Sequence, residues 1–203
     1  MKKRKSKIKC LLFDYGGVLT SGSIDPVHDA LNRKLGKRVF VRKASLHSQI
    51  LKGWIKSRDY YMAIAEKTGK SQKYIGELFL STYTRLIKLN KRTLSLAKNA
   101  KRNGYKIGIL SNITSVVKGV NEKRGLFKEF SPVILSCDVG CMKPQKKMYR
   151  IAINKSGLRP EEIVYIDDRK ELLLPAKRLG MKTLHFRNAS QLRQDLKKVG
   201  VKI

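Results

Sequence analysis

The stretch Phe13-Asp14-Tyr15-Gly16-Gly17-Val18-Leu19-Thr20 decides the fold prediction, because it joins a short apolar run to a glycine turn. Residues 8–14 are apolar enough for a buried strand, and that strand ends on the carboxylate of Asp14. The two glycines predict a tight turn that exposes backbone N–H groups. We therefore expect a strand whose carboxyl end presents a carboxylate beside backbone donors.

The rest of the chain alternates short apolar strands with helical patterns. The further predicted strands are residues 106–112, 132–136, 163–168 and 182–186. The predicted helices between and after them are residues 91–103, 115–124, 145–156, 169–179 and 189–198. Strands that alternate with helices of about 10–15 residues are typical of a parallel sheet covered on both faces. We predict an α/β fold with a three-layer, Rossmann-like parallel sheet as its core.

Residues 21–88 interrupt this alternation. They contain no convincing strand, and their helical stretches are residues 25–35, 43–51, 58–67 and 71–86. We therefore predict a helical insertion at 21–88 and an α/β core built from residues 1–20 and 89–203.

Length and composition exclude several classes of protein. A chain of 203 residues suits one domain with an insertion. No apolar run approaches the ~18 residues of a membrane span, and the apolar stretch after the basic N-terminus is too short for a signal peptide. The cysteines and histidines lack metal-ligand spacing, and the odd cysteine count argues against a disulfide framework; they are Cys10, Cys137, Cys141, His28, His47 and His185. We expect a reduced, cytoplasmic protein.

The charge balance points to anionic partners. Lys and Arg number 46 against 15 Asp and Glu, a formal net charge of +31, and six of the first nine residues are basic. Such a surface attracts phosphorylated substrates, nucleic acid or acidic lipid headgroups. The alternative is a lysine-rich composition throughout the organism, which would indicate no partner.

Polar side chains collect where the predicted strands end. They are Asp14, Ser111, Asn112, Asp167 and Asp168, with Lys143 in the loop between the third and fourth strands. Open parallel sheets place their sites at this edge. There, a carboxylate can attack a phosphoryl group, and a carboxylate pair can hold magnesium. A hydroxyl and a lysine can bind the remaining phosphate oxygens.

The order of these elements resembles the haloacid dehalogenase-like hydrolase superfamily over nearly the whole chain. The four stretches that carry the resemblance are Phe13 to Thr20, Ile109 to Asn112, Ser136 to Pro144 and Tyr165 to Asp168. The helical insertion is similar to the small cap found after the first motif in part of this family. The resemblance thus implies that residues 21–88 form a cap over the active site.

The resemblance also implies roles for individual residues. Asp14 would be the nucleophile, and Ser111 and Lys143 would bind the transferred phosphoryl group, with Asn112 also on the substrate side. The metal would be Mg²⁺, held by Asp14, the Gly16 carbonyl and Asp168, with Asp167 supporting it.

Two positions depart from the family pattern. Most phosphatases of this family carry an Asp as general acid and base two residues after the nucleophile, where this chain has Gly16. Leu172 stands four residues after Asp168, where the family usually has Asn or Asp. The first change removes a proton donor, and the second removes a polar group near the metal.

These features predict a magnesium-dependent phosphatase that hydrolyses a small phosphorylated metabolite through an aspartyl-phosphate. One alternative enzyme is a dehalogenase, for which the Asp167–Asp168 pair has no use. The alternative from another class is a nucleic-acid-binding protein on a degenerate hydrolase fold, favoured by the charge and by Gly16. For the enzyme, we also expect weak, sequence-independent binding of DNA or RNA through the basic surface.

Overall fold

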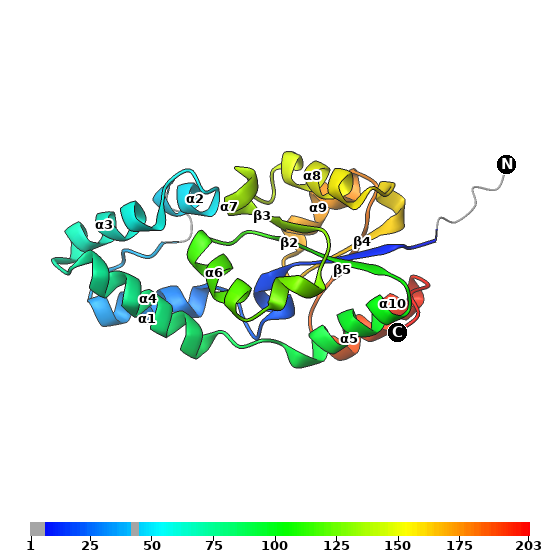
Figure 1. Cartoon of the computed structure of the whole chain (residues 1–203), viewed down its shortest axis with the longest axis horizontal. Coiled ribbons are helices and arrows are strands. Elements are labelled where there is room, and N and C mark those ends of the chain that lie inside the picture. The colour runs from blue at the N-terminus through cyan, green and yellow to red at the C-terminus, as the bar shows by residue number, and fades with distance from the viewer. Residues whose placement is uncertain (1–6, 42–44) are drawn as a thin grey trace.

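Five parallel strands form one sheet in the computed structural model, which describes residues 7–41 and 45–203 (Figure 1). They are β1 (Cys10–Phe13), β2 (Lys106–Ser111), β3 (Val133–Leu135), β4 (Ile163–Asp167) and β5 (Lys182–His185). Their order across the sheet is β3-β2-β1-β4-β5. The chain therefore moves outward from β1 to β3 and then returns to β4 on the other side of β1. This arrangement confirms the predicted α/β class.

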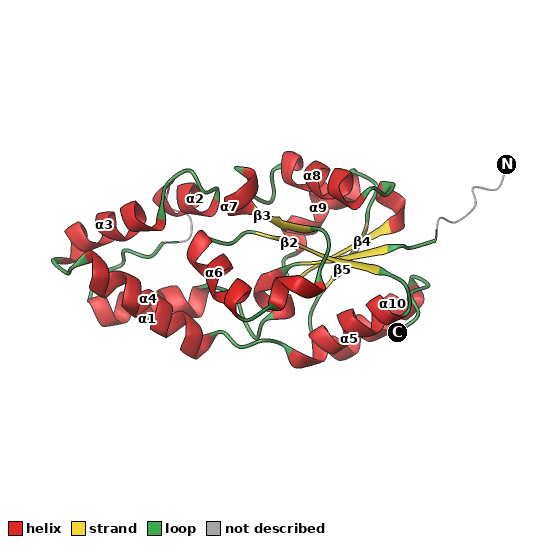
Figure 2. Cartoon of the chain, viewed as in Figure 1, coloured by secondary structure: helices red, strands yellow, loops and turns green. Residues whose placement is uncertain are grey.

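Helices cover both faces of the sheet (Figure 2). One face carries α5 (Lys91–Arg102) and α10 (Ala189–Lys198), and the other carries α8 (Lys146–Ser156) and α9 (Lys170–Arg178). Leu11 and Phe13 belong to the core on the α5 side, whereas Cys10 and Leu12 belong to the core on the α8 side. All four are fully buried, as expected for a central strand with two covered faces. The three-layer prediction is confirmed.

A helical turn, η1 (Tyr15–Leu19), follows β1 within the first motif, and the chain then enters four helices. These are α1 (Asp25–Leu35), α2 (Ser45–Leu51), α3 (Ser57–Thr68) and α4 (Gln72–Leu86). We call them the helical insertion. Figure 1 shows them at the end of the molecule opposite α10.

The helical insertion leaves and rejoins the rest of the chain at one place. Thr20 forms a β-bridge with Leu89, and Ser21 N donates to Lys88 O at 2.8 Å. Asn90 N then donates to Leu19 O at 2.8 Å, and α5 begins directly after Asn90. These paired connections fix where the insertion sits relative to β1.

Aromatic side chains form the interior of the helical insertion. Phe40 lies against Phe79 with ring centroids 6.1 Å apart, and Phe79 stacks on Tyr83 at the same distance. Tyr61 contacts both Phe79 and Tyr60 at 5.7 Å. Each ring is buried, so these contacts give the insertion a packed core of its own.

Most predicted elements differ from the observed ones by one or two residues at their ends. The clear correction is at Ser136, which we predicted as the end of a strand. It is instead the first residue of a short helix, α7 (Ser136–Val139), because its side chain bonds the backbone N and O of Ile113 at 3.0 and 3.2 Å. The helix predicted at residues 115–124 is α6 (Ser115–Lys123), and the sequence analysis did not predict the turns η2 (Leu126–Glu129) and η3 (Pro160–Glu162).

Two predictions fall partly outside the described residues. The start of the helix predicted at residues 43–51 lies there, as does most of the basic N-terminus. Within the described ranges, no helix is long and apolar enough to cross a membrane.

Candidate active site

The strand register brings the predicted site residues to one edge of the sheet. Phe13 of β1 lies opposite Ile109 of β2 and Ile166 of β4. Asp14 follows Phe13, and its backbone N donates to Ile166 O at 2.8 Å. Because β2 and β4 end nearby on Ser111 and Asp167, these side chains converge where the connections on the two sides of β1 diverge. Such a crevice is where open α/β sheets bind ligands.

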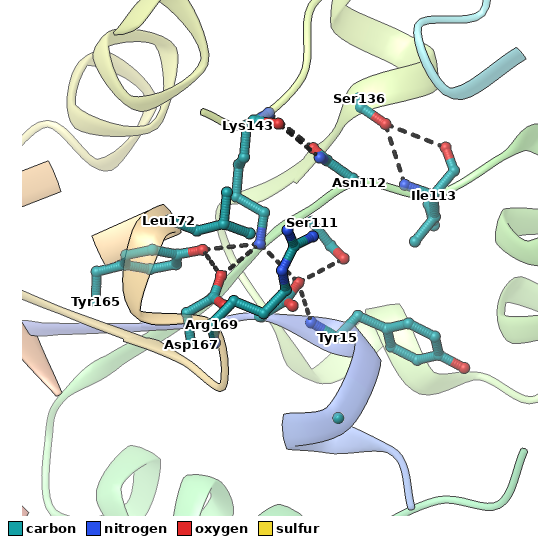
Figure 3. Close-up of polar contacts among 12 residues, drawn as sticks. Tyr15, Ser111, Asn112, Ile113, Ser136, Lys143, Tyr165, Asp167, Arg169 and Leu172 are labelled. Carbon is teal, nitrogen blue, oxygen red and sulfur yellow. Dashed lines mark hydrogen bonds and ion pairs between the residues drawn. The ribbon is translucent and has the colours of Figure 1, made fainter. Parts of the chain in front are cut away.

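Three donors converge on one oxygen of the Asp14 carboxylate. Oδ1 accepts hydrogen bonds from Tyr15 N and from Ser111 Oγ, both at 2.7 Å. The ammonium of Lys143 lies 2.9 Å from the same oxygen (Figure 3). Asp14 is only 6% exposed, so these contacts hold its carboxylate in one orientation, with Oδ2 taking part in none of them.

Lys143 is almost fully buried, at 2% exposure, and its ammonium joins two carboxylates. Nζ lies 2.9 Å from Asp14 and 2.7 Å from Asp167, and it also contacts the Tyr165 hydroxyl at 2.8 Å. A buried lysine keeps its charge only when such partners compensate for lost hydration. The structure therefore places a fixed positive charge beside Asp14.

Asn112 holds the loop that carries Lys143. Its side-chain Nδ2 donates to Lys143 O at 2.9 Å, and its Oδ1 accepts from Lys143 N at 2.8 Å. Both ends of the amide are thus bound to one backbone unit (Figure 3). The contact between Asn112 and substrate stays a prediction, whereas its positioning of Lys143 is visible in the structure.

Burial and charge shift the pKa values of this cluster. Burial alone would lower the pKa of Lys143, but the charges of Asp14 and Asp167 outweigh it and raise that pKa. Burial raises the pKa of Asp14 more than Lys143 lowers it. Burial and then the charges of Asp14 and Asp167 raise the pKa of Asp168 to about 6. The site thus concentrates more negative charge than one lysine neutralises.

The three carboxylates form a cluster that a hard cation would suit. One oxygen from each of Asp14, Asp167 and Asp168 lies within 4.8 Å of the others. Both oxygens of Asp167 already accept from the protein: Oδ1 from Arg169 N at 2.9 Å, and Oδ2 from Lys143 and the Tyr165 hydroxyl. Asp14 and Asp168 are therefore the carboxylates better placed to bind an ion directly. An all-oxygen donor set of this kind fits magnesium.

The glycine pair lies against this cluster. Gly17 has a φ of 77°, and a Cβ atom added there would lie 2.3 Å from Oδ2 of Asp168. Only glycine fits that position. Gly16 has ordinary extended angles, with φ −70° and ψ 126°, and an added Cβ would meet no atom within 4 Å. Steric contacts and backbone angles therefore require glycine at position 17 but not at position 16.

Some residues at the site were missed by the sequence analysis. The Tyr165 hydroxyl contacts both Lys143 and Asp167. Residues two apart in a strand share a face, so the spacing of Tyr165 and Asp167 was a usable signal. Arg169 lines the same cavity, but the sequence carries no comparable signal for it. An acidic residue, Glu171, follows two positions later, which is the pattern of a surface ion pair, and the structure shows this pair at 2.5 Å. Leu172, which the sequence analysis already placed near the metal, lines the cavity as a buried apolar residue.

The cluster opens into a cavity of about 500 Å³. Its walls come from the carboxyl edge of the sheet and from the helical insertion, which contributes residues of α2, α3 and α4. The arrangement combines a carboxylate held in one orientation, a buried cation and a candidate metal site at one end of this cavity.

Known proteins resemble this chain at the level of sequence. The bifunctional epoxide hydrolase 2 of Rattus norvegicus is 27% identical over 169 residues, which are 74% of this chain and 30% of that protein. The chain spans about a third of the length of that relative. A sesquiterpene phosphatase of Aspergillus oryzae, astK, is 23% identical over 194 residues, 94% of this chain and 96% of that protein.

Solved structures share the fold. A haloacid dehalogenase family enzyme of Bacteroides thetaiotaomicron, crystallised with magnesium and inorganic phosphate, superposes with a TM-score of 0.74 at 23% identity, covering 89% of this chain and 95% of that one. The sequence profile of haloacid dehalogenase-like hydrolases matches residues 8–180. That match spans most of the chain, so the protein belongs to the haloacid dehalogenase-like hydrolase family.

Proposed function

We propose that this chain is a magnesium-dependent phosphatase that hydrolyses a small phosphomonoester through an aspartyl-phosphate on Asp14. The observation that carries the proposal is the fixing of Asp14 Oδ1 by Tyr15 N, Ser111 and Lys143. A carboxylate oriented in this way, with its other oxygen outside these contacts, is arranged for attack on phosphorus.

In the proposed reaction, Oδ2 of Asp14 attacks phosphorus in line with the ester oxygen. The ester P–O bond breaks, and the alcohol leaves with a proton taken from solvent, because Gly16 supplies no acid. The hydroxyl of Ser111 and the ammonium of Lys143 stabilise the equatorial phosphoryl oxygens, the main task in this chemistry. A water molecule then attacks the phosphorus of the aspartyl-phosphate, which releases phosphate and restores Asp14.

Magnesium, when bound by Asp14, the Gly16 carbonyl and Asp168, would neutralise charge on the transferred phosphoryl group. The chain's own contribution is to fix those oxygens. Asp167 acts one step away from the reaction, by holding Lys143 at 2.7 Å. We propose that residues 21–88 serve as a cap over the core formed by residues 1–20 and 89–203, because the helical insertion supplies much of the cavity wall.

The relatives support a phosphatase over a dehalogenase. The Aspergillus oryzae protein is named a phosphatase, and a relative in Methanocaldococcus jannaschii, 30% identical over 103 residues, is named a glyceraldehyde 3-phosphate phosphatase. The Bacteroides thetaiotaomicron enzyme binds magnesium and phosphate in its crystals. A cluster of three carboxylates also suits a reaction that needs a metal.

The test is phosphate release from a panel of phosphomonoesters, with magnesium and after chelation. We expect Asp14→Asn to abolish turnover and Asp168→Asn to raise the magnesium concentration needed for activity. The matched control is Asp138→Asn, since Asp138 is exposed and contacts Lys118 at 2.8 Å, away from the cavity. Full activity in the presence of chelator would contradict the metal assignment, and full activity of Asp14→Asn would contradict the nucleophile.

A further inference from the structure

The part of the cavity inside the helical insertion differs in chemistry from the part beside Asp14. Its walls there are mainly aromatic and aliphatic side chains: Ile24, Ile50, Leu51, Tyr60, Tyr61, Phe79, Tyr83 and Ile87. Several of these rings also contact one another, as in the stacked pair Phe79 and Tyr83. Because the wall is tied into the insertion's own core, it is a preformed surface.

Charged side chains are confined to the phosphate end of this cavity. The described lining residues that carry a full charge are Asp14, Lys143, Asp168 and Arg169, all from the edge of the sheet. The lining that the insertion's described residues provide has no Lys, Arg, Asp or Glu, in a chain with 46 basic residues. Its titratable groups are the tyrosines and His28 and His47, whose rings lie 4.9 Å apart.

Several polar groups of the same walls are already bound within the protein. The Tyr83 hydroxyl contacts the Tyr15 hydroxyl at 2.8 Å, and the Tyr60 hydroxyl lies 3.4 Å from Nδ1 of His47. Ser48 Oγ donates to Ser45 O at 3.0 Å. A polyol bound here would lose its hydrogen bonds to water and would meet wall groups whose hydrogen bonds are already formed, which costs free energy. A second phosphate or a carboxylate would be buried without a cation.

We propose that this cavity selects the monophosphate of an uncharged, largely apolar alcohol, with the phosphate at Asp14 and the hydrocarbon against the insertion's wall. The proposal rests on the proposed phosphatase function and specifies its substrate class. It excludes sugar phosphates, nucleotides and bisphosphates as good substrates. A hydrocarbon group increases the affinity of a substrate here because its apolar surface is removed from water. A polar substrate would find no charged group in the described wall to bind it.

The test is a series of alkyl monophosphates from methyl to octyl, compared with glycerol 3-phosphate and glucose 6-phosphate. Each of these esters releases an alkoxide from an unsubstituted or primary carbon, so the leaving-group chemistry is the same throughout. The compounds differ in chain length and in the additional hydroxyl groups of glycerol and glucose. We expect kcat/KM to rise about fourfold for each buried methylene until the cavity is filled. Farnesyl and naphthylethyl monophosphates then distinguish a chain-shaped from an aromatic substrate. Equal or faster turnover of glycerol 3-phosphate or glucose 6-phosphate than of octyl phosphate would overturn the proposal.

A variant pair tests the wall itself. Leu51 is half-buried at the end of α2 and lines the cavity, so Leu51→Arg places a charge in the wall with little loss of packing. We expect it to lower kcat/KM for octyl phosphate by at least about tenfold and to change that for methyl phosphate less than about twofold. Leu80→Arg is the control, since Leu80 is 43% exposed on α4 and outside the cavity lining. Equal losses for both substrates in Leu51→Arg would overturn the assignment of the wall.

Calorimetric binding of the same alkyl phosphates separates this proposal from the phosphatase proposal. If no ester is hydrolysed with magnesium present, the proposed function fails. Affinity that still rises with chain length would then support the cavity assignment, and affinity that is flat with chain length would overturn it.

Discussion

Replacing Gly16 by Asp should restore a proton donor to the active site. Most phosphatases of the family have an acidic residue at this position, where this chain has Gly16. Without that acid, the departing alkoxide in the proposed reaction takes its proton from solvent. A positioned general acid contributes about 10²–10⁴-fold to the rate of such a step. The gain should therefore appear with alkyl phosphates, whose leaving groups are poor, and be small with aryl or acyl phosphates, which need little protonation.

The structure shows that this substitution is sterically allowed. Gly16 has φ −70° and ψ 126°, angles that any residue adopts, and a Cβ atom there meets nothing within 4 Å. The neighbouring position is the opposite case, since Gly17 has a positive φ and lies against Asp168. Gly16→Asp should therefore fold normally. A factor of 10²–10⁴ corresponds to about 2.7–5.5 kcal/mol of the activation free energy.

The assay is kcat/KM for esters that span a range of leaving-group pKa values, in the wild type and in Gly16→Asp. We expect a steep dependence on leaving-group pKa in the wild type and a shallow one in the variant. Gly16→Asn is the matched control, because it has the same shape and no acidic proton. A flat dependence in the wild type, or an equal gain from Gly16→Asn, would refute the inference that the missing acid limits the reaction.

Further predictions follow from the same cluster. Gly17→Ala should weaken magnesium binding at least tenfold and lower stability by about 1–3 kcal/mol, because it combines a strained φ with an overlap on Asp168; magnesium titration and urea unfolding measure both. Lys143→Met should cost about 3–5 kcal/mol in urea unfolding, since it leaves the buried carboxylates of Asp14 and Asp167 without their cation; an unchanged midpoint would contradict the electrostatic account. Because the pKa of Asp168 is raised to about 6, its protonated form favours folding, so this group's contribution to the stability of the metal-free protein should fall as pH rises from about 4 to 6. Protons should also compete with magnesium there, raising its apparent dissociation constant about tenfold between pH 7 and pH 5, as calorimetry can measure.

The sheet could be predicted from sequence because its signals are local. Each strand is a short apolar run, and each ends in polar residues, so the order of the elements already placed Asp14, Ser111 and Asp167 at one edge. The observed register pairs Phe13 with Ile109 and Ile166, which brings Asp14 level with the ends of β2 and β4. The predicted site residues converge for that reason.

The contacts that hold the site in place could not be predicted in the same way. The clamp from Asn112 to the backbone of Lys143 joins residues 31 positions apart, and the bond from Ser136 to Ile113 joins residues 23 apart. Local patterns assign such residues to loops or strand ends, so the sequence interpretation gave Asn112 a substrate contact and extended β3 to Ser136. The long-range hydrogen bond of Ser136 corrects the strand end, and that of Asn112 adds the positioning of Lys143 to a substrate contact that stays a prediction.

The charge of the chain and the chemistry of its cavity act at different ranges, so they need not indicate the same partner. A net charge of +31 attracts phosphorylated anions from solution, but at physiological salt that attraction is screened beyond about 8 Å. The described wall of the helical insertion carries no charged side chain, so discrimination there depends on apolar contact, which added salt does not screen. Added salt should therefore lower kcat/KM for every phosphate ester by the same factor, because it slows the encounter. The ratio of kcat/KM between longer and shorter alkyl chains should stay unchanged. This separates attraction by the surface from selection by the cavity, and it explains how a strongly basic protein could select an apolar substrate.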